Sequence, residues 1–286
     1  MELSRDSSLR SMLRDIWLSE DVAVSLRSKQ FVATVVPRPL LIAAKKRYYA
    51  ALIKDPQTPR EADMEALSQV VRPGDFALDI GAFVGFYTQR LSQLVGATGE
   101  VWAFEPVSET FSILSYVVRE LSLSNVRVLN LALSDSDGEA VMEIPRYRGG
   151  GEKLYGAHIV SNRSASNRRA ISIQRRTLDS MLSGGACGQR VHFMKLDVEF
   201  HELHTVCGAI DTVRRDHPVI FTEWLAASDP ANSRPKLQNL LAAQGYRAFR
   251  YIDRKLVPCA PDEDCQNRFF LTQSHVTEFA QFIRRD

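Results

Sequence analysis

A chain of 286 residues is long enough for one large α/β domain with additions, and its 45% apolar and 24% charged residues are ordinary for a soluble globular protein. The formal charge of +2 gives no general case for binding nucleic acid or a membrane. No apolar run reaches the length of a membrane span, and the first residues lack the apolar core of a signal peptide. The cysteines show no C-x-x-C spacing, so we expect a cytoplasmic protein with free thiols.

Residues 1–70 are expected to form a helical extension. Apolar residues recur at helical spacing over 8–29 and again over 40–53, with prolines between them, and 59–71 predicts a further helix. An apolar helical stripe usually indicates burial, so we expect the extension to pack against the core or against a second copy of the chain. A cap over a substrate pocket is the alternative. Residues 71–286 are expected to form the main domain.

The most informative stretch of the chain is 76–106, which reads FALDIGAFVGFYTQRLSQLVGATGEVWAFEP. A short apolar run contains Asp79, and Gly81 and Gly85 follow it. A helical pattern and a second apolar run ending in Glu105 come next. This order predicts a strand, a glycine turn, a helix and a parallel strand, with backbone N–H groups open to a ligand at the turn.

This turn has three possible interpretations: a site for a dinucleotide, a site for a different cofactor, or a purely structural turn. A dinucleotide site would show G-x-G-x-x-G, whereas this chain has D-x-G-x-x-x-G beginning at Asp79. An acid there would repel a pyrophosphate, but it suits a ligand that carries an ammonium group, such as the methionine end of S-adenosylmethionine (SAM). Glu105 lies where nucleotide-binding α/β folds hydrogen-bond a ribose. The pattern therefore favours SAM over an NAD-type cofactor.

The elements that follow continue the α/β alternation. We predict a helix over 108–121 and strands over 126–130 and 139–144. Residues 145–170 are rich in glycine, serine, asparagine and arginine, which predicts a mobile basic loop. This loop is either simply solvated or a lid that attracts an acidic or phosphate-bearing substrate. The basic residues concerned are Arg146, Arg148, Lys153, Arg163, Arg168 and Arg169.

The last third of the chain supplies the remaining elements of an open sheet. Strands are predicted over 171–175, 191–196, 218–223, 246–251 and 268–271, and helices over 177–182, 200–213 and 235–244. The fold class is therefore α/β, with a mostly parallel sheet of seven strands and helices on both faces. In such sheets ligands bind at the carboxyl ends of the strands, where Asp197 and Glu223 are placed.

Several later segments complete a family pattern. They read LNLALSDSDGE (129–139), RTLDSM (176–181), KLDVEFHEL (195–203) and PVIFTEW (218–224). Together with the turn at 79–85, these segments resemble the FkbM family of SAM-dependent methyltransferases. The resemblance implies a class I, Rossmann-like methyltransferase fold with an antiparallel last strand. It also places Asn130 and Ala132 near the adenine, while Ala82 and Phe83, in the glycine turn, are further candidates for cofactor contacts.

The richest cluster of reactive side chains lies at 195–202. Lys195 and Asp197 fall on one face of the predicted strand, and Glu199, His201 and Glu202 follow. We interpret His201 as a general base whose basicity nearby acids raise, and Asp197 as a residue near the transferring methyl group and the sulfonium. Alternatively, His201 and Glu202 face solvent in the first helical turn.

A divalent cation is a further alternative for the same cluster. Asp197, Glu199 and Glu223 could bind an ion that acidifies the acceptor hydroxyl, although alternate strand positions do not face one way. We do not favour a metal site.

One position departs from the family pattern, which has K-x-D-V-E-G where this chain has Phe200 after Glu199. A phenyl ring there predicts an acceptor site of different shape. The resemblance implies methylation of a hydroxyl group on a small or glycosylated metabolite of the sugar or polyketide kind, as in secondary metabolite biosynthesis. N-methylation and a SAM-binding partner protein without activity are the alternatives.

Overall fold

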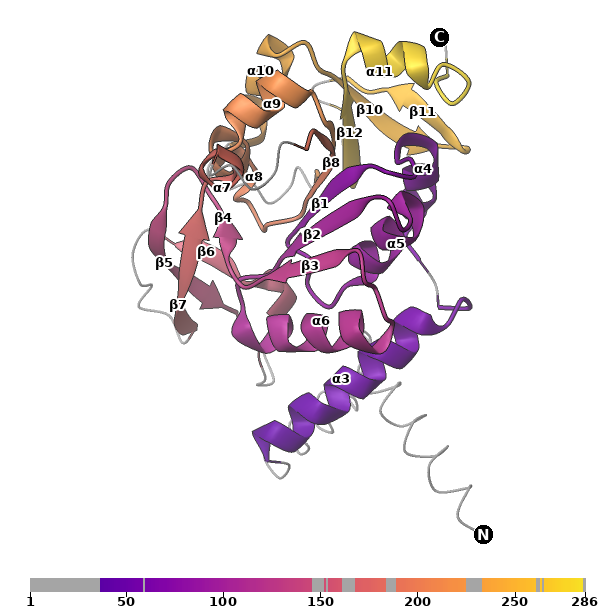
Figure 1. The fold of residues 1–286 in the computed structure, drawn as a ribbon. Coiled ribbons are helices and arrows are strands. Elements are labelled where there is room, and N and C mark those ends of the chain that lie inside the picture. Colours follow the sequence, from indigo (N-terminus) through magenta and orange to yellow (C-terminus); the bar gives the residue numbers. More distant parts are fainter. Residues whose placement is uncertain are drawn as a thin grey trace.

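The computed structural model describes residues 37–58, 60–145, 152, 154–160, 168–183, 189–224, 233–260, 263 and 265–284. In this part of the chain, eight strands form a central sheet in the order β11-β10-β12-β9-β8-β1-β2-β3 (Figure 1). The strands of this sheet are β1 Phe76–Ile80, β2 Glu100–Phe104, β3 Val126–Leu129, β8 Val191–Leu196, β9 Val219–Glu223, β10 Arg247–Ile252, β11 Lys255–Pro258 and β12 Asn267–Leu271. The strands from β9 through β3 run parallel.

Helices cover both faces of the central sheet. One face holds α4 Asp63–Val70, α5 Phe86–Val95 and α6 Ser108–Glu120, and the opposite face holds α7 Leu178–Ser183, α8 Glu202–Cys207, α9 Ile210–Asp216 and α10 Ser233–Ala243. The alternation of strand residues explains the division, because Ala77 and Val101 pack on the first side while Leu78 and Trp102 pack on the second. The short helix α11 Gln273–Glu278 follows β12.

Helix α3 Arg38–Lys54 lies outside this layer and packs along α6 (Figure 1). Lys45 Nζ and Arg38 Nη2 lie 2.9 and 2.8 Å from the Glu109 carboxylate, which joins the two helices by charge. The helices predicted over 8–29 lie outside the described residues. No helix in the described ranges is long and apolar enough to cross a membrane.

A second, smaller sheet lies beside the central one, with strand order β4-β7-β5-β6 in the described chain (Figure 1). It consists of β4 Ala132–Leu133, β5 Gly138–Ile144, β6 His158–Val160 and β7 Arg169–Arg176, and the 3-10 helix η1 Leu154–Gly156 precedes β6. The sequence predicted a mobile loop over 145–170. In the part of that segment that the structure describes, η1, β6 and the start of β7 are regular elements, so the segment is not simply a loop.

Only two of the six basic residues named for that segment lie within the described residues. Arg146, Arg148, Lys153 and Arg163 lie outside the described residues. Arg168 pairs with Glu143 at 3.4 Å, and Arg169 pairs with Glu152 at 2.9 Å.

The far edge of the central sheet differs from the prediction of seven strands. The antiparallel β12, which the family resemblance implied, is confirmed by its pairing with β9 and β10. The structure adds β11 as an eighth strand in the described chain, paired with β10 through a turn at Asp253 and Arg254. Both turn residues have positive φ, 51° and 63°, although neither is a glycine, and this absence hid the hairpin in the sequence.

The single helix predicted from 200 to 213 is wrong, because α8 and α9 are separate. Gly208 lies at the break, and a Cβ atom built there would be 1.8 Å from the carbonyl oxygen of Ser134. The chain therefore needs glycine at this position to bring the helix pair against the segment after β4.

The turn between β8 and α8 contains two residues in the left-handed region. Glu199 has φ 50° and Phe200 has φ 71°. Phe200 occupies the position where the family pattern has glycine, so the backbone keeps a glycine-like conformation that a side chain makes costly. The guanidinium of Arg234 lies 5.7 Å from the Phe200 ring centroid, which offsets part of this cost.

Phe200→Gly and Phe200→Ala test this strain as a matched pair. At ordinary positions alanine is the more stable choice, by about 0.4–1 kcal/mol. Here we expect Phe200→Gly to unfold with a free energy about 1 kcal/mol higher than Phe200→Ala, because only glycine adopts φ 71° without strain. Urea unfolding of both variants measures the difference. A more stable alanine variant would show that the turn is not strained.

Candidate functional site

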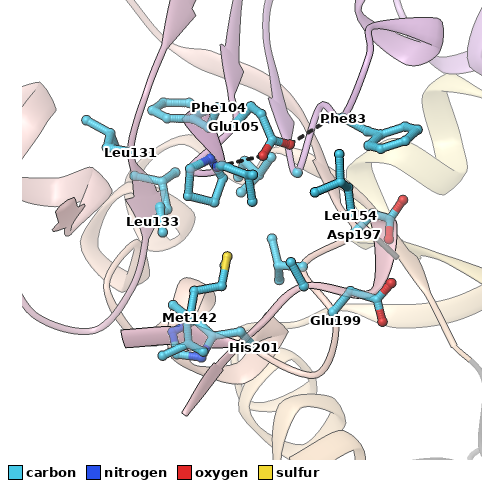
Figure 2. A pocket seen from close by; sticks show the side chains of 18 of the residues that line it. Phe83, Phe104, Glu105, Leu131, Leu133, Met142, Leu154, Asp197, Glu199 and His201 are labelled. Carbon is cyan, nitrogen blue, oxygen red and sulfur yellow. Dashed lines mark hydrogen bonds between the residues drawn. The ribbon is translucent and has the colours of Figure 1, made fainter. Parts of the chain in front are cut away.

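The carboxyl ends of β1, β2, β8 and β9 meet at one edge of the central sheet, and a cavity of about 220 Å³ opens there (Figure 2). Acids line it from three of these strand ends: Glu105 after β2, Asp197 after β8 and Glu223 at the end of β9. The rest of the wall is largely apolar and includes Phe104, Val107, Leu131, Ala132, Leu133, Met142, Leu154, Ala157 and Ile159. We call this the cofactor cavity, because the sequence predicts that a cofactor binds at these strand ends.

The turn after β1 brings bare backbone to the cofactor cavity. Gly81 has φ 79°, and a Cβ atom built on it would be 1.8 Å from the carbonyl oxygen of Asp197. Gly85, with φ 105°, begins α5, and its Cβ would be 2.9 Å from Leu114. Both glycines are required for close approach, the first between two strand ends and the second between two helices. Of the other predicted turn residues, Phe83 lines this cavity and Ala82 does not.

Glu105 is fixed where the sequence predicted a ribose acceptor. Its two carboxylate oxygens accept hydrogen bonds from the backbone N–H groups of Phe83 (3.1 Å) and Val107 (2.8 Å), and the residue is 6% exposed (Figure 2). Asn130 donates from its side-chain amide to the carbonyl of Glu105 at 2.8 Å, so it supports the strand end. Among the predicted adenine contacts, Ala132 lines the cavity and Asn130 does not.

Asp79 lies behind this surface and is fully buried. The register of β1 and β8 places it beside Lys195, whose Nζ is 3.4 Å from Asp79 and 3.2 Å from Asp197. Lys195 also donates to the carbonyl oxygen of Gly81 at 3.1 Å. Burial alone would lower the pKa of Lys195, but the two carboxylates outweigh it and raise that pKa, so the ammonium remains charged.

His201 lies on the opposite side of the cofactor cavity from Glu105, close to Met142 (Figure 2). Its Nε2 is 2.9 Å from Ser134 Oγ, and its ring stacks on His204 at 4.5 Å. Burial, and then His204, lower the pKa of His201 to about 4. This direction is opposite to the raised basicity predicted from the sequence, because burial outweighs the opposing effect of Asp135. Glu202 accepts from the backbone N–H of Val198 at 3.3 Å.

Ser134 is a hydrogen-bonded neighbour of His201 that sequence reasoning missed. It follows β4, is fully buried and also donates to Asp135 Oδ1 at 3.3 Å. Thr205 of α8 donates to the carbonyl of Leu133 at 3.1 Å, which fixes this segment against the His201 helix. A serine in a polar run gives no sequence signal for such a contact.

The three candidate metal ligands Asp197, Glu199 and Glu223 all line the cofactor cavity. Within the described ranges, however, no group of three or more histidine, cysteine, aspartate or glutamate residues is placed to hold a metal ion. Burial, and then Asp197 and Glu202, raise the pKa of Glu223 to about 7. Glu223 therefore carries a labile proton near neutral pH.

A second cavity, of about 660 Å³, adjoins the first. The second sheet forms much of it, with Glu139, Ala140 and Val141 from β5 and His158, Ile159 and Val160 from β6. Ile159, Glu199 and His201 line both cavities. Phe200, at the position of the family glycine, lines the second cavity and not the cofactor cavity.

A comparison with solved structures finds methyltransferases, with TM-scores below 0.5. The FkbM methyltransferase of Methylobacillus flagellatus is 16% identical, with a TM-score of 0.44; the match covers 80% of this chain and 58% of that protein, so the chain spans little more than half of its length. A SAM-dependent O-methyltransferase of Thermotoga maritima is 13% identical, with coverages of 84% and 72% and a TM-score of 0.40. Fibrillarin of Aeropyrum pernix, solved with bound SAM, is 14% identical, with coverages of 72% and 73% and a TM-score of 0.41.

A search of curated proteins found no match. The family model of the FkbM methyltransferase domain matches residues 79–248, which run from the acid of the glycine turn into β10 and include every strand end around the cofactor cavity. This match confirms the resemblance seen in the segments at 79–85, 129–139 and 195–203. The chain belongs to the FkbM family of SAM-dependent methyltransferases.

Proposed function

We propose that the protein transfers a methyl group from SAM to a hydroxyl group of a small or glycosylated metabolite. The observation that carries the proposal is the position of His201, a neutral imidazole on the wall between the cofactor cavity and the second cavity. Transfer to a hydroxyl requires alignment and a group that takes the hydroxyl proton.

The residues of the cofactor cavity fit SAM. Glu105 is a buried carboxylate on a largely apolar wall, and each of its oxygens keeps a lone pair beyond the bond it already accepts, which suits the two ribose hydroxyls. The apolar stretch Leu131 to Leu133 would pack on the adenine, and the bare backbone at Gly81 would lie against the sulfur side. When bound, SAM supplies a methyl group that its positive sulfur already activates.

The protein's own contribution would be the removal of a proton. The Ser134 hydroxyl has one hydrogen; when it donates to Asp135, Ser134 Oγ accepts from His201 Nε2–H. With these two hydrogen bonds, His201 is the tautomer in which Nδ1 carries the lone pair. Nδ1 can then take the proton of the acceptor hydroxyl. A base with a pKa of about 4 suffices if it acts late, because a hydroxyl oxygen that has gained a methyl group is strongly acidic.

We place the acceptor in the second cavity, beyond His201. This cavity has aliphatic positions from β5 and β6, the Phe200 ring and hydrogen-bonding groups such as Ser172. Its charged lining consists of the acids Asp135, Glu139 and Glu199 and of Arg175, which lies 3.8 Å from Asp135. A neutral hydroxylated molecule suits such a lining better than a strongly anionic one.

N-methylation is the second candidate, and one observation favours it. Asp197, Glu199 and Glu223 line the cofactor cavity, and these acids would attract a cationic amine. A neutral amine needs no base, so His201 would be dispensable for that reaction.

A panel of hydroxylated and amine-bearing acceptors, incubated with methyl-labelled SAM and analysed by mass spectrometry, tests the reaction class. We expect labelled O-methyl products. Label on nitrogen alone would favour the second candidate, and no turnover with any acceptor would favour a SAM-binding partner protein.

His201→Ala is expected to lower kcat for O-methylation by about 10²–10⁴-fold, the usual contribution of a general base. Because the pKa of His201 is about 4, the imidazole is neutral at higher pH, and the wild-type kcat at saturating SAM should be constant from about pH 6 to 9. Steady-state measurements of kcat over this pH range test the prediction. A rate that rises with a midpoint near pH 7, and loses that rise in Glu223→Gln, would assign the proton to Glu223 instead.

Binding of S-adenosylhomocysteine is expected to release a proton near neutral pH. Burial raises the pKa of Glu105 to about 8, against the opposing effect of its two backbone N–H partners. Ribose hydroxyls that donate to Glu105 stabilise its charged form and lower this pKa, so affinity should rise with pH up to about 8, by at most tenfold per unit. Calorimetry in two buffers of different ionisation enthalpy counts the protons. Glu105→Gln should bind more weakly and lose this pH dependence; unchanged behaviour would contradict the assignment.

A further inference from the structure

The ring of Phe200 lies beside the boundary between the cofactor cavity and the second cavity. Glu199 and His201, its neighbours in the chain, line both cavities, and Figure 2 shows their side chains at the cofactor cavity. Of the two cavities, Phe200 lines the second only. An acceptor whose hydroxyl group reaches His201 from the second cavity would therefore bring its neighbouring atoms close to this ring.

The chain keeps the Phe200 ring at a conformational cost. Phe200 has φ 71°, and Glu199 before it has φ 50°, so two consecutive residues other than glycine lie in the left-handed region. Glycine, which the family pattern has at position 200, adopts this conformation without strain. Strained residues gather at binding and catalytic sites, where the strain places a group for its ligand. We therefore looked for a ligand that the ring would contact.

Arg234 fixes the orientation of the Phe200 ring. Its guanidinium lies over one face of the ring, 5.7 Å from the centroid, and also lies 6.0 Å from the centroid of the Trp224 ring. Arg234 is buried, and a cation that has left water binds an aromatic face more strongly than an exposed one does. Since Arg234 covers one face, the second cavity meets the remaining surface of a ring that is held in place.

Aliphatic side chains supply the other apolar part of the second cavity. They come from β5 and β6, where Val141 pairs with Val160, and they are Ala140, Val141, Ile159 and Val160. A cavity lined in this way can enclose a small molecule with an apolar body. An aromatic body gains more from Phe200 than a saturated one, because two aromatic rings attract each other beyond the area that they bury.

Two further observations restrict the acceptor. Phe200 and His201 are consecutive, so their Cα atoms are about 3.8 Å apart, and a hydroxyl group at the imidazole belongs close to a ring that packs on Phe200. The acids Asp135, Glu139 and Glu199 line the second cavity and would repel an anion. A phenol meets both conditions, because its hydroxyl is attached to the ring and, with a pKa of about 10, remains neutral at pH 7.

We propose that the acceptor is a phenol, whose aromatic ring packs against Phe200 while its hydroxyl group reaches His201 Nδ1, and that Phe200 is the residue that selects it. The inference rests on the proposed function, which places the acceptor in the second cavity. A lone pair of the phenol oxygen forms the bond to the methyl carbon as the carbon–sulfur bond breaks and leaves its electron pair on sulfur. The phenol proton passes to His201 Nδ1, and the products are an aryl methyl ether and S-adenosylhomocysteine.

Calorimetry on the full chain saturated with S-adenosylhomocysteine tests the selection without turnover. The two probes are naphthol and its fully saturated counterpart decahydronaphthol, of which only the first is flat and aromatic. Phe200→Leu removes the ring but keeps an apolar side chain. It should weaken naphthol about two- to twelvefold more than decahydronaphthol, the range expected for the loss of an aromatic pair. Phe200→Tyr keeps the ring and should retain the wild-type ratio of the two affinities.

Val160→Ala is the matched control, because it removes apolar surface from the same cavity without removing a ring. It should weaken both probes to a similar extent. Neither Phe200 nor Val160 lines the cofactor cavity, so the affinity for S-adenosylhomocysteine should be unchanged in every variant and reports that each has folded. Phe200→Gly, which relieves the strain at φ 71°, should lose the same preference and replaces Phe200→Leu if that variant fails to fold.

Equal losses for the two probes in Phe200→Leu, or no binding of naphthol to the wild-type protein, would overturn the proposal. Faster methylation of decahydronaphthol than of naphthol by the wild-type protein would also overturn it. No methyl transfer to any acceptor of the panel would instead contradict the proposed function, and the ratio of the two binding constants would still decide whether Phe200 selects an aromatic ligand.

Discussion

The site depends on one buried ammonium group. Lys195, 3% exposed, lies between Asp79 and Asp197 and also binds the carbonyl of Gly81. It therefore joins the turn after β1 to the turn after β8, two segments that line the cofactor cavity. A charge removed from water is expensive unless several partners compensate it, and loss of one partner of such a group typically costs about 3–5 kcal/mol. The precise position of Gly81 against Asp197 follows from this constraint.

The second sheet has a role beyond stability. Its residues Met142 and Ile159 complete the cofactor cavity, and the same sheet supplies much of the second cavity. An open α/β sheet alone offers a crevice at its strand ends. Here described residues of β4, β5, η1 and β6 line that crevice and turn it into a cavity with an apolar wall. The part of the chain least like a regular α/β unit in sequence is the part that shapes the site.

The local features of the cofactor site could be read from sequence, because they depend on residues close together in the chain. The glycine turn, Glu105 at the end of the second strand and Asp197 at the end of a later strand all follow from short patterns. Features set by distant contacts could not be read in this way. Burial, and then His204, lower the pKa of His201, whereas the neighbouring acids in the sequence suggested the reverse. The pairing of β5 with β7 likewise joins segments on either side of a glycine-rich stretch.

The break between α8 and α9 has a consequence for the chemistry. Gly208 lets the helix pair approach the carbonyl of Ser134, and the hydroxyl of the same serine bonds His201. A methyl group at 208 would meet that carbonyl before it met anything in a cavity. The chain would then have to move the serine away from the imidazole or move the helix away from the sheet. Gly208, which lines neither the cofactor cavity nor the second cavity, thus sets the position of the imidazole that we propose as the proton acceptor.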